Sequence, residues 1–509
     1  MHDVLIVGGG SAGCVLAARL SEDPRRRVLL VEAGSDHPDF ALAPEPVRIA
    51  VGGVAVTEHF GGLDWGYSGT GSAMGGVIAI PRGRVMGGSG AVNGCIFLRG
   101  LPEDFERWAG IVGPEWGWEH MLPAYRAIEA DPVGEDAVHG REGPFPVFRY
   151  PRDSWSVTQL AFEDACRELG YGAISDHNAP DAMGVSQLPL NQEDGLRWGP
   201  ARALLAAAVR GRPNLTIRAD TRVLRLALRD GRVIGVHARG VAGSSLVEAG
   251  ETILAAGAVG SPHLLLLSGI GPADDLRRVG IDVVADVPGV GSGVRDHPKT
   301  WIEWRLREGV PGSPHEPILQ LSTRYTASGS ELRGDMMLYP NSIVAGPGGR
   351  LGFRIEAVNN LQLSAGRLAL RSADPDVAPA IDLRLLSEAR DRERLVDAIE
   401  RSLALAEASA LRTVCGERVR PDVADPTDRR ALGDYVERTI MTGQHISSSC
   451  PMGRADDPGA VVGADARVHG VAGLRIVDGS IMPDSIRANT HATILAMAQL
   501  MAGRISASG

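Results

Sequence analysis

The start of the chain alternates between short apolar runs and one amphipathic stretch. DVLIV at 3–7 is almost continuously apolar, which predicts a buried strand. The glycine-rich segment GGGSAG follows at 8–13, and RVLLVE at 27–32 predicts a second buried strand. Between them, apolar residues recur at helical spacing and polar residues then end the helix: Ala12, Val15, Leu16 and Leu20, followed by Ser21, Asp23 and Pro24. The pattern therefore predicts a strand–helix–strand unit with a glycine-rich first turn.

The glycines of this unit have the spacing of a dinucleotide-binding turn. Gly8 permits the tight turn, Gly10 lets the backbone approach a pyrophosphate, and Gly13 lets helix and strand pack closely. The pyrophosphate then lies at the helix N-terminus, where free N–H groups favour negative charge. Glu32, at the end of the second strand, can accept hydrogen bonds from both hydroxyls of an adenosine ribose. The pattern predicts a cofactor that contains ADP and leaves open whether it is NAD or FAD.

Later segments decide between these cofactors. GRVMGGSGAVNG at 83–94 offers backbone without Cβ atoms where a flat ring must be approached closely. It resembles a signature segment of the glucose–methanol–choline (GMC) family of FAD-dependent oxidoreductases. Three further segments are similar to that family's pattern: GAVGSPHLLLLSGIG at 257–271, VRDHP at 294–298 and GLRIVDGSIMPDSIRANTHATILAMA at 473–498. Because the matches occur in order from the N-terminus to about residue 498, the resemblance spans nearly the whole chain.

The resemblance, together with the first turn, implies a set of FAD contacts. These are Gly8, Gly10, Ser11, Ala12, Gly13, Glu32, Ser89, Asn93, Gly94, Ile96, Val223, Asp478 and Ala492. Val223 lies in TRVLRL, a strand whose backbone is expected to meet the adenine. In some family members a histidine near the second glycine segment is bonded to the flavin. Val92 occupies that place here, so the FAD is expected to be non-covalent.

The order of the segments implies an α/β fold with two interleaved domains. We expect a Rossmann-like FAD-binding domain of the GMC type, built from residues 1–150, 205–300 and 455–509. Residues 151–204 and 301–454 are expected to form an α+β substrate domain on an antiparallel sheet. A chain of 509 residues is long enough for two such cores.

The segment GQHISSSCPMG at 443–453 contains the first catalytic candidate, His445. The resemblance implies a pair formed by His445 and His491, the second of which precedes the helical pattern ATILAMAQLMAGRI. An imidazole can take the hydroxyl proton of an alcohol at neutral pH while hydride leaves its carbon for the flavin. The helix N-terminus after His491 would favour negative charge on the ring. The family's usual H-P and G-T are replaced by Ile446 and by serines, so which histidine is the base stays open.

Other chemistries remain as alternatives. A serine hydrolase could use Ser447, Ser448 or Ser449 with His445, but none of these three serines lies in a G-x-S-x-G elbow. A zinc site of His445, Cys450 and His491 lacks tight ligand spacing, so no metal is expected. A hydroxynitrile lyase on the same scaffold and a flavin-binding protein without catalysis are the other two alternatives.

The closer resemblance is to a branch of the family associated with mycofactocin, a peptide-derived redox cofactor. Gly90 and the run FLRGLPEDFERW at 97–108 carry it. The resemblance implies oxidation of an alcohol CH–OH group, with electrons passed either to oxygen, as in an oxidase, or to a redox carrier, as in a dehydrogenase. The sequence does not separate these two acceptors.

Composition limits the partners. The net charge of −10 and the scattered arginines argue against nucleic-acid binding. The five cysteines are widely spaced without a C-x-x-C pair, which favours a reducing compartment. No apolar run approaches the length of a membrane span, and the chain enters its first strand too early for a signal peptide. We therefore expect a cytoplasmic protein whose partners are an alcohol and an electron acceptor.

Overall fold

The computed structural model describes residues 2–50, 62–312, 317–345 and 351–507. Its first large sheet has the order β10-β2-β1-β13-β12-β11, and β25 also pairs with β13. The strands are β1 (His2–Val7), β2 (Val28–Val31), β10 (Leu215–Arg218), β11 (Arg222–Arg229), β12 (Arg232–Gly240), β13 (Gly243–Leu254) and β25 (Leu474–Ile476). β1 is parallel to both β2 and β13. Consecutive parallel strands such as β1 and β2 need a crossover connection, which is usually a helix.

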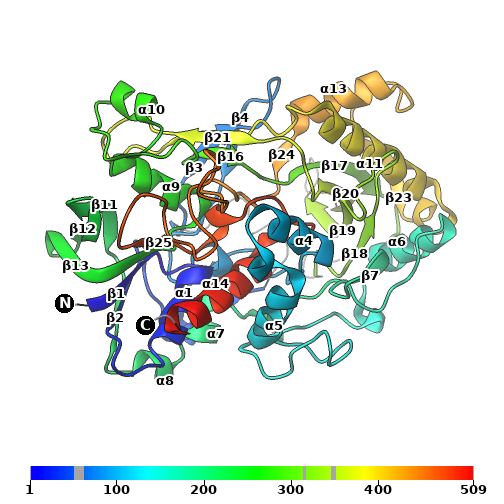
Figure 1. The fold of residues 1–509 in the computed structure, drawn as a ribbon. Coiled ribbons are helices and arrows are strands. Elements are labelled where there is room, and N and C mark those ends of the chain that lie inside the picture. The colour runs from blue at the N-terminus through cyan, green and yellow to red at the C-terminus, as the bar shows by residue number, and fades with distance from the viewer. Residues whose placement is uncertain (1, 51–61, 313–316, 346–350, 508–509) are drawn as a thin grey trace.

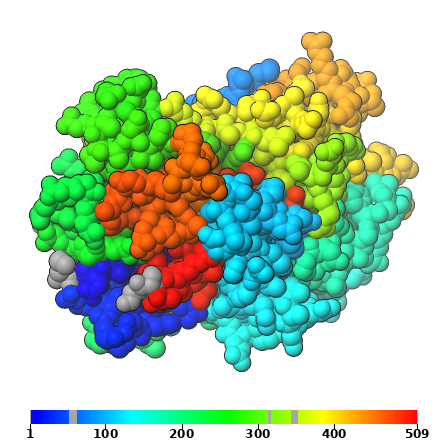
Figure 2. Space-filling model, viewed as in Figure 1, coloured from blue at the N-terminus to red at the C-terminus, as the bar shows by residue number. Residues whose placement is uncertain are grey.

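The predicted strand–helix–strand unit is confirmed. β1 and β2 are joined through α1 (Ser11–Leu20), whose apolar face is buried. α1 packs against the C-terminal helix α14 (Thr490–Ala507), so the two ends of the chain lie side by side (Figure 1). Figure 2 shows the same contact on the surface, where the N-terminal blue and C-terminal red segments adjoin.

The second large sheet is antiparallel, as predicted. Its order is β23-β17-β20-β19-β18-β7, and β24 (Met441–Thr442) also pairs with β17. The other strands are β7 (Gly184–Gln187), β17 (Pro298–Leu306), β18 (Leu321–Tyr325), β19 (Met336–Ala345), β20 (Leu351–Asn359) and β23 (Cys415–Arg420). α11 (Ala389–Glu407) packs against β17, β19 and β20 and covers one face of this sheet (Figure 1).

Buried and cavity-lining side chains alternate along β20, which shows that the other face of the sheet borders a cavity. Phe353, Ile355 and Ala357 are fully buried, whereas Arg354 and Glu356 line a large cavity. Because successive side chains of a strand point to opposite faces, α11 covers the apolar face and the polar face is free to contact a ligand. The cavity therefore lies between the two large sheets.

A third sheet links segments that are distant in sequence. Its order is β16-β21-β22-β3-β4, from Ser292–Val294, Gly366–Ala369, Ala380–Asp382, Tyr67–Thr70 and Val77–Ile80. It thus combines strands from both predicted domains. The division at the bounds given above stays a prediction. No helix of the described residues is both long and apolar enough to cross a membrane.

Other helices complete the described structure. They are α2 (Glu45–Arg48), α4 (Pro102–Ile111), α5 (Trp118–Ile128), α6 (Val157–Glu168), α7 (Pro200–Leu204), α8 (Ala207–Arg210), α9 (Gly257–Leu267), α10 (Ala273–Arg278), α12 (Ser409–Arg412) and α13 (Arg429–Thr439). α9 packs against β11 and α5 packs against α14, so both cover elements that line or support the cavity (Figure 1).

Candidate active site

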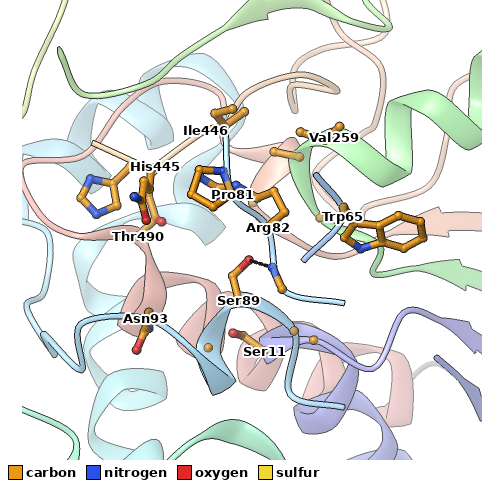
Figure 3. A pocket seen from close by; sticks show the side chains of 18 of the residues that line it. Ser11, Trp65, Pro81, Arg82, Ser89, Asn93, Val259, His445, Ile446 and Thr490 are labelled. Carbon is orange, nitrogen blue, oxygen red and sulfur yellow. Dashed lines mark hydrogen bonds between the residues drawn. The ribbon is translucent and has the colours of Figure 1, made fainter. Parts of the chain in front are cut away.

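The cavity has a volume of about 750 Å³ and extends from the first turn of the chain to the polar face of the second sheet. In Figure 3, Ser11, Ser89 and Asn93 lie along one side, Trp65 lies at one end, and His445 and Thr490 lie at the other. Most predicted cofactor contacts line it: Gly8, Gly10, Ser11, Ala12, Glu32, Ser89, Asn93, Gly94, Ile96, Val223 and Asp478. These predicted contacts are therefore brought together on one surface.

The first turn and Glu32 form the end of the cavity that is predicted to bind the nucleotide. The Glu32 carboxylate accepts hydrogen bonds from Gly9 N at 2.7 Å and from Gly34 N at 2.8 Å. Burial raises the pKa of Glu32 to about 7, while these backbone donors favour the ionised form. Two N–H donors occupy only part of the lone-pair capacity of a carboxylate, so it can still accept from ribose hydroxyls.

Gly13 and Ala492 differ from the other predicted contacts because neither lines the cavity. A Cβ on Gly13 would lie 1.9 Å from the carbonyl oxygen of Gly8, so this glycine permits close packing of α1 on β1. Ala492 is fully buried in the first turn of α14. Their expected contact with the cofactor stays a prediction.

The middle of the cavity is held by hydrogen bonds between segments of the glycine-rich regions. Ser89 Oγ accepts from Gly83 N at 3.1 Å (Figure 3), and Asn93 Oδ1 accepts from Arg197 Nη1 at 2.9 Å. Asp478 accepts from Gly257 N at 2.9 Å, which ties the C-terminal segment to the start of α9. These bonds fix the surface that an isoalloxazine ring would meet.

Unpartnered polar atoms show that this surface fits FAD. The Nε and Nη2 atoms of Arg82 and the Nε2 atoms of His263 and His491 are buried and have no hydrogen-bond partner among the described residues, and all three residues line the cavity. Buried polar groups normally have partners, so these atoms indicate a polar ligand. Val92 also lines the cavity, and its side chain has no atom that could form a covalent bond to a flavin.

His445 lies where the second sheet meets the glycine-rich surface. Its Nε2 is 3.0 Å from Nδ2 of Asn489, and its Nδ1 is 2.9 Å from Nδ1 of His297. Burial first, and then electrostatic interactions with His297, Arg82 and Lys299, hold the pKa of His445 well below its ordinary value. The ring is therefore a neutral base at physiological pH.

His491 has a different environment on the same cavity. Its Nδ1 is 3.1 Å from Ser11 Oγ, and its ring lies edge-on to Phe97 and Phe145. Burial lowers the pKa of His491 to about 3. Among the hydrogen bonds of the described residues, His445 and His491 share none. The structure therefore brings both predicted histidines to the cavity but gives His445 another polar partner, Asn489.

The serines near His445 bond elsewhere. Ser449 Oγ donates to the carbonyl of Ala258 at 2.6 Å, and Ser447 and Ser448 contact each other through their hydroxyls at 3.5 Å. Because both ring nitrogens of His445 have other partners, this geometry gives the serine hydrolase alternative no support.

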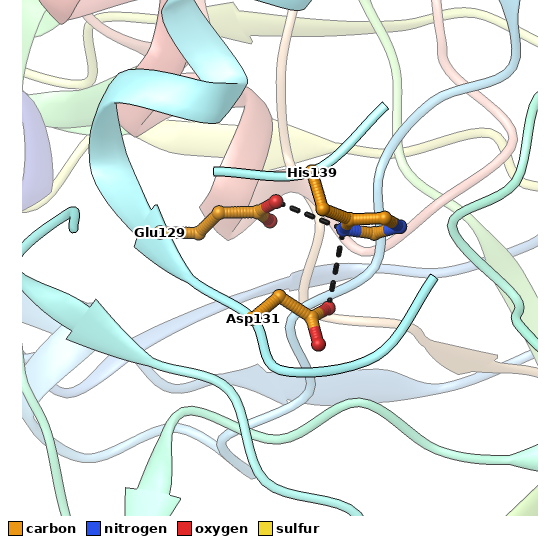
Figure 4. A group of neighbouring side chains, drawn as sticks. All are labelled: Glu129, Asp131 and His139. Carbon is orange, nitrogen blue, oxygen red and sulfur yellow. Dashed lines mark hydrogen bonds and ion pairs between the residues drawn. The ribbon is translucent and has the colours of Figure 1, made fainter. Parts of the chain in front are cut away.

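One cluster elsewhere has the composition of a metal site. Of the residues that the structure describes, only Glu129, Asp131 and His139 bring three ligand atoms within 4.8 Å of one another (Figure 4). His445, Cys450 and His491 do not form such a group. The cluster is already paired with buried arginines: Arg149 donates to Asp131 at 2.7 Å, and Arg99 bonds Glu129.

The charges of this cluster balance. Burial alone would lower the pKa of His139, but its hydrogen bonds to Asp176 and Glu129 raise it to about 9. Three positive groups, Arg99, Arg149 and the protonated His139, thus balance the charge of three carboxylates. The carboxylates are those of Glu129, Asp131 and Asp176. Because the folded pKa of His139 exceeds its ordinary 6.5, its contribution to stability is complete below pH 6.5 and is lost as the pH rises through about 9.

We expect Arg149→Ala to lower the free energy of unfolding by about 3–5 kcal/mol, because it leaves buried carboxylates without their guanidinium partner. Arg454→Ala is the matched control, since Arg454 and Asp456 form an exposed pair at 3.1 Å and exposed pairs contribute about 0–1 kcal/mol. Urea unfolding of both variants at pH 7 measures the difference. Equal midpoints for the two variants would show that the network does not stabilise the fold.

Sequence reasoning did not assign a role to several residues that line the cavity. Asn489 is part of the C-terminal segment, and Lys299 directly follows VRDHP. Arg82 lies just before the second glycine segment, and Tyr339 and Trp301 come from β19 and β17. Asn489 could have been considered from the sequence, because it is a polar residue two positions before His491. Tyr339 and Trp301 belong to no recognisable sequence motif.

Comparison with known proteins identifies the family. The sequence models of the GMC oxidoreductase family match residues 2–299 and 362–498. The chain is 34% identical over 536 residues to a 5-(hydroxymethyl)furfural oxidase of Methylovorus sp., covering 99% of this chain and 98% of that protein. It is 32% identical over 551 residues to a glucose dehydrogenase [FAD, quinone] of Drosophila melanogaster, covering 98% and 85%.

A solved structure gives the same result in three dimensions. The crystal structure of pyridoxine 4-oxidase from "Mesorbium loti" superposes with a TM-score of 0.92 at 33% identity, covering 100% of this chain and 99% of that one. The chain therefore belongs to the GMC oxidoreductases, FAD-dependent enzymes that oxidise alcohol CH–OH groups.

Proposed function

We propose that this enzyme oxidises a primary alcohol carried on a flat ring, with His445 as the base and Asn489 as its partner. The observation that carries the proposal is the 3.0 Å contact between His445 Nε2 and Asn489 Nδ2 at the cavity wall. An acceptor and a donor side by side match an alcohol oxygen that gives up its proton and gains negative charge.

His445 has the protonation state that this role needs. Its pKa lies well below the ordinary value, chiefly because of burial, so the ring is neutral and its nitrogen without a proton can accept the hydroxyl proton. When bound, FAD supplies the acceptor for the hydride that leaves the carbon. The chain itself has to orient the hydroxyl and take its proton.

Asn489 is oriented to stabilise the alcohol oxygen. Tyr339 donates its hydroxyl proton to Oδ1 of Asn489 at 3.3 Å, which turns the Nδ2 donors toward His445 and the cavity. Arg82 adds a positive charge whose Nε and Nη2 lack partners in the described structure. Both features favour an oxygen that becomes an alkoxide as its proton leaves.

His491 is better suited to hold the cofactor than to act as the base. Its Nδ1 is occupied by Ser11, in the first turn that receives the pyrophosphate end. Its Nε2 has no hydrogen-bond partner among the residues that the structure describes, and His491 lies in the first turn of α14, where the helix dipole favours negative charge. We propose that this nitrogen meets the flavin.

The polar sheet face supports a ring-bearing substrate. Trp301 and Tyr339 present aromatic surface to the cavity, and Asn341 lies beside them as a hydrogen-bonding group. Lys299 and Glu356 pair at 3.4 Å on the same face. Two relatives are named for ring compounds, 5-(hydroxymethyl)furfural and pyridoxine, and both are similar along their full length to this chain.

The test is the visible spectrum of the purified, FAD-containing protein under anaerobic conditions. We expect benzylic and heteroaromatic primary alcohols to bleach the flavin bands faster than aliphatic alcohols of similar size. Bleaching by aliphatic alcohols alone would contradict the ring-bearing substrate. Bleaching by no alcohol would contradict alcohol oxidation and favour the lyase alternative.

Admitting air to the bleached sample then separates the two electron acceptors. Rapid return of colour would identify an oxidase. Persistent bleaching would identify a dehydrogenase that needs a carrier, such as the mycofactocin suggested by the sequence, and the relatives include proteins named as oxidases and as dehydrogenases.

A further inference from the structure

The VRDHP segment has no role in the proposed chemistry so far, although it surrounds His445. Asp296 Oδ1 accepts a hydrogen bond from the backbone N of His445 at 2.9 Å. Arg295 and Ser447 exchange two backbone hydrogen bonds at 3.0 and 2.9 Å, and Gly443 N donates to the carbonyl of His297 at 2.7 Å. The backbone on both sides of His445 is therefore held by residues 295–297.

We infer that His297 is a positioning residue that fixes His445 in the tautomer whose Nε2 is an acceptor facing the cavity. The inference rests on the proposed role of His445 as the base. The VRDHP segment then positions His445 in two ways. Asp296 hydrogen-bonds its backbone N, and His297 hydrogen-bonds its ring.

The first line of evidence comes from the His297 side. Only one proton can lie between the two Nδ1 atoms, which are 2.9 Å apart, so one ring donates and the other accepts. Burial lowers the pKa of His297 to about 3, while a hydrogen bond to the backbone of Ile486 favours a proton on its ring. Because Nδ1 of His297 faces His445, Nε2 is the ring nitrogen left to donate to that backbone, and a neutral His297 then has an unprotonated Nδ1. His445 must then donate from its own Nδ1.

The second line of evidence comes from the opposite end of the chain of contacts and is independent of the first. The Tyr339 hydroxyl can donate to Asn489 Oδ1, which leaves Nδ2 of Asn489 as the atom that faces His445 Nε2. An amide nitrogen only donates, so His445 Nε2 must accept and carries no proton. Both ends therefore give the same tautomer of His445, with the proton on Nδ1.

The tautomer decides whether His445 can act. A ring protonated at Nε2 would present a donor to the alcohol and could not take its proton. Once Nε2 has accepted the proton, the Nδ1–H···Nδ1 hydrogen bond to His297 becomes charge-assisted and stabilises the imidazolium. A carboxylate could serve the same purpose, but the carboxylate of Asp296 bonds the backbone of His445 and the hydroxyl of Thr442 instead.

The direct test is ¹⁵N NMR of the FAD-containing protein labelled at histidine, with the His445 signals identified by their loss in His445→Gln. We expect the His445 Nδ1 to be protonated and Nε2 to be unprotonated in the resting enzyme. A protonated Nε2 would overturn the inference. This readout needs no turnover, so it stands or fails separately from the proposed base role of His445.

Two variants test the role of His297 in the reaction. His297→Ala removes the acceptor, and we expect a mixture of His445 tautomers and flavin reduction by alcohol slowed at least 10-fold, with FAD content unchanged. His297→Asn keeps an oxygen acceptor near the position of Nδ1, and we expect it to restore the single tautomer and most of the rate. Wild-type tautomer and rate in His297→Ala would overturn the inference, as would an Asn variant no better than Ala.

Discussion

Replacing His445 with alanine is expected to slow anaerobic reduction of bound FAD by alcohol by about 10²- to 10⁴-fold, the usual contribution of a positioned base. The loss arises because the hydroxyl proton then has no acceptor at the cavity wall, where Nε2 of His445 lies 3.0 Å from Asn489. The FAD content should not change, since the Ser11, Glu32 and Gly10 end of the cavity is untouched. Stopped-flow spectroscopy at saturating alcohol measures the rate directly.

His491→Ala is the matched control for this prediction, because His491 is also a histidine that lines the same cavity. We expect it to lower FAD content or alter the flavin spectrum, since it removes the Nε2 proposed to meet the ring. Its effect on the reduction rate of the molecules that retain FAD should be smaller than that of His445→Ala. A larger rate loss in His491→Ala, with full FAD content, would reverse the roles that we propose for the two histidines.

The first turn was predictable because its signals are local. β1, α1 and β2 follow directly from short apolar runs, helical spacing and glycines within residues 2–31. The antiparallel sheet was foreseen only through the family resemblance, since its strands come from segments as distant as Gly184–Gln187 and Cys415–Arg420. Pairing across such separations has no local signal.

The partner of His445 illustrates a different limit. Asn489 and His491 are both polar and two residues apart, and α14 begins at Thr490 between them. Residues two apart at a helix start are separated by about 200° around its axis, so they face different neighbours. The motif identified the segment, but only the three-dimensional arrangement indicates which of the two residues faces His445 and which faces Ser11.

His297 was missed for a related reason. It lies 148 positions from His445, and their contact depends on the pairing of β17 with β24. The VRDHP segment was recognised as part of a family pattern, yet a pattern of letters does not show that two histidines share a proton. The positive φ values of Gln444 and Ser448, 66° and 61°, bend the loop around His445 and were equally invisible in the sequence.

The largest effect on the cofactor is expected from Gly10→Val, which should yield folded protein without FAD. The glycines of the first turn are not equivalent. A Cβ on Gly8 would lie 2.6 Å from the carbonyl oxygen of Ala255, and one on Gly13 would lie 1.9 Å from that of Gly8, so substitutions there damage the fold itself. A Cβ on Gly10 meets no protein atom closer than 3.8 Å, although Gly10 lines the cavity.

The side chain of valine at position 10 would therefore exclude the pyrophosphate rather than break the protein, because only Gly allows that close an approach of backbone to ligand. The purified variant should lack flavin absorbance and should melt at the temperature of FAD-stripped wild type, since bound ligand accounts for the difference. Gly503→Val is the control: its Cβ meets no atom within 4 Å and it lies on the exposed side of α14. Full FAD occupancy in Gly10→Val would refute the pyrophosphate assignment, and melting well below the stripped wild type would show that Gly10 serves the fold instead.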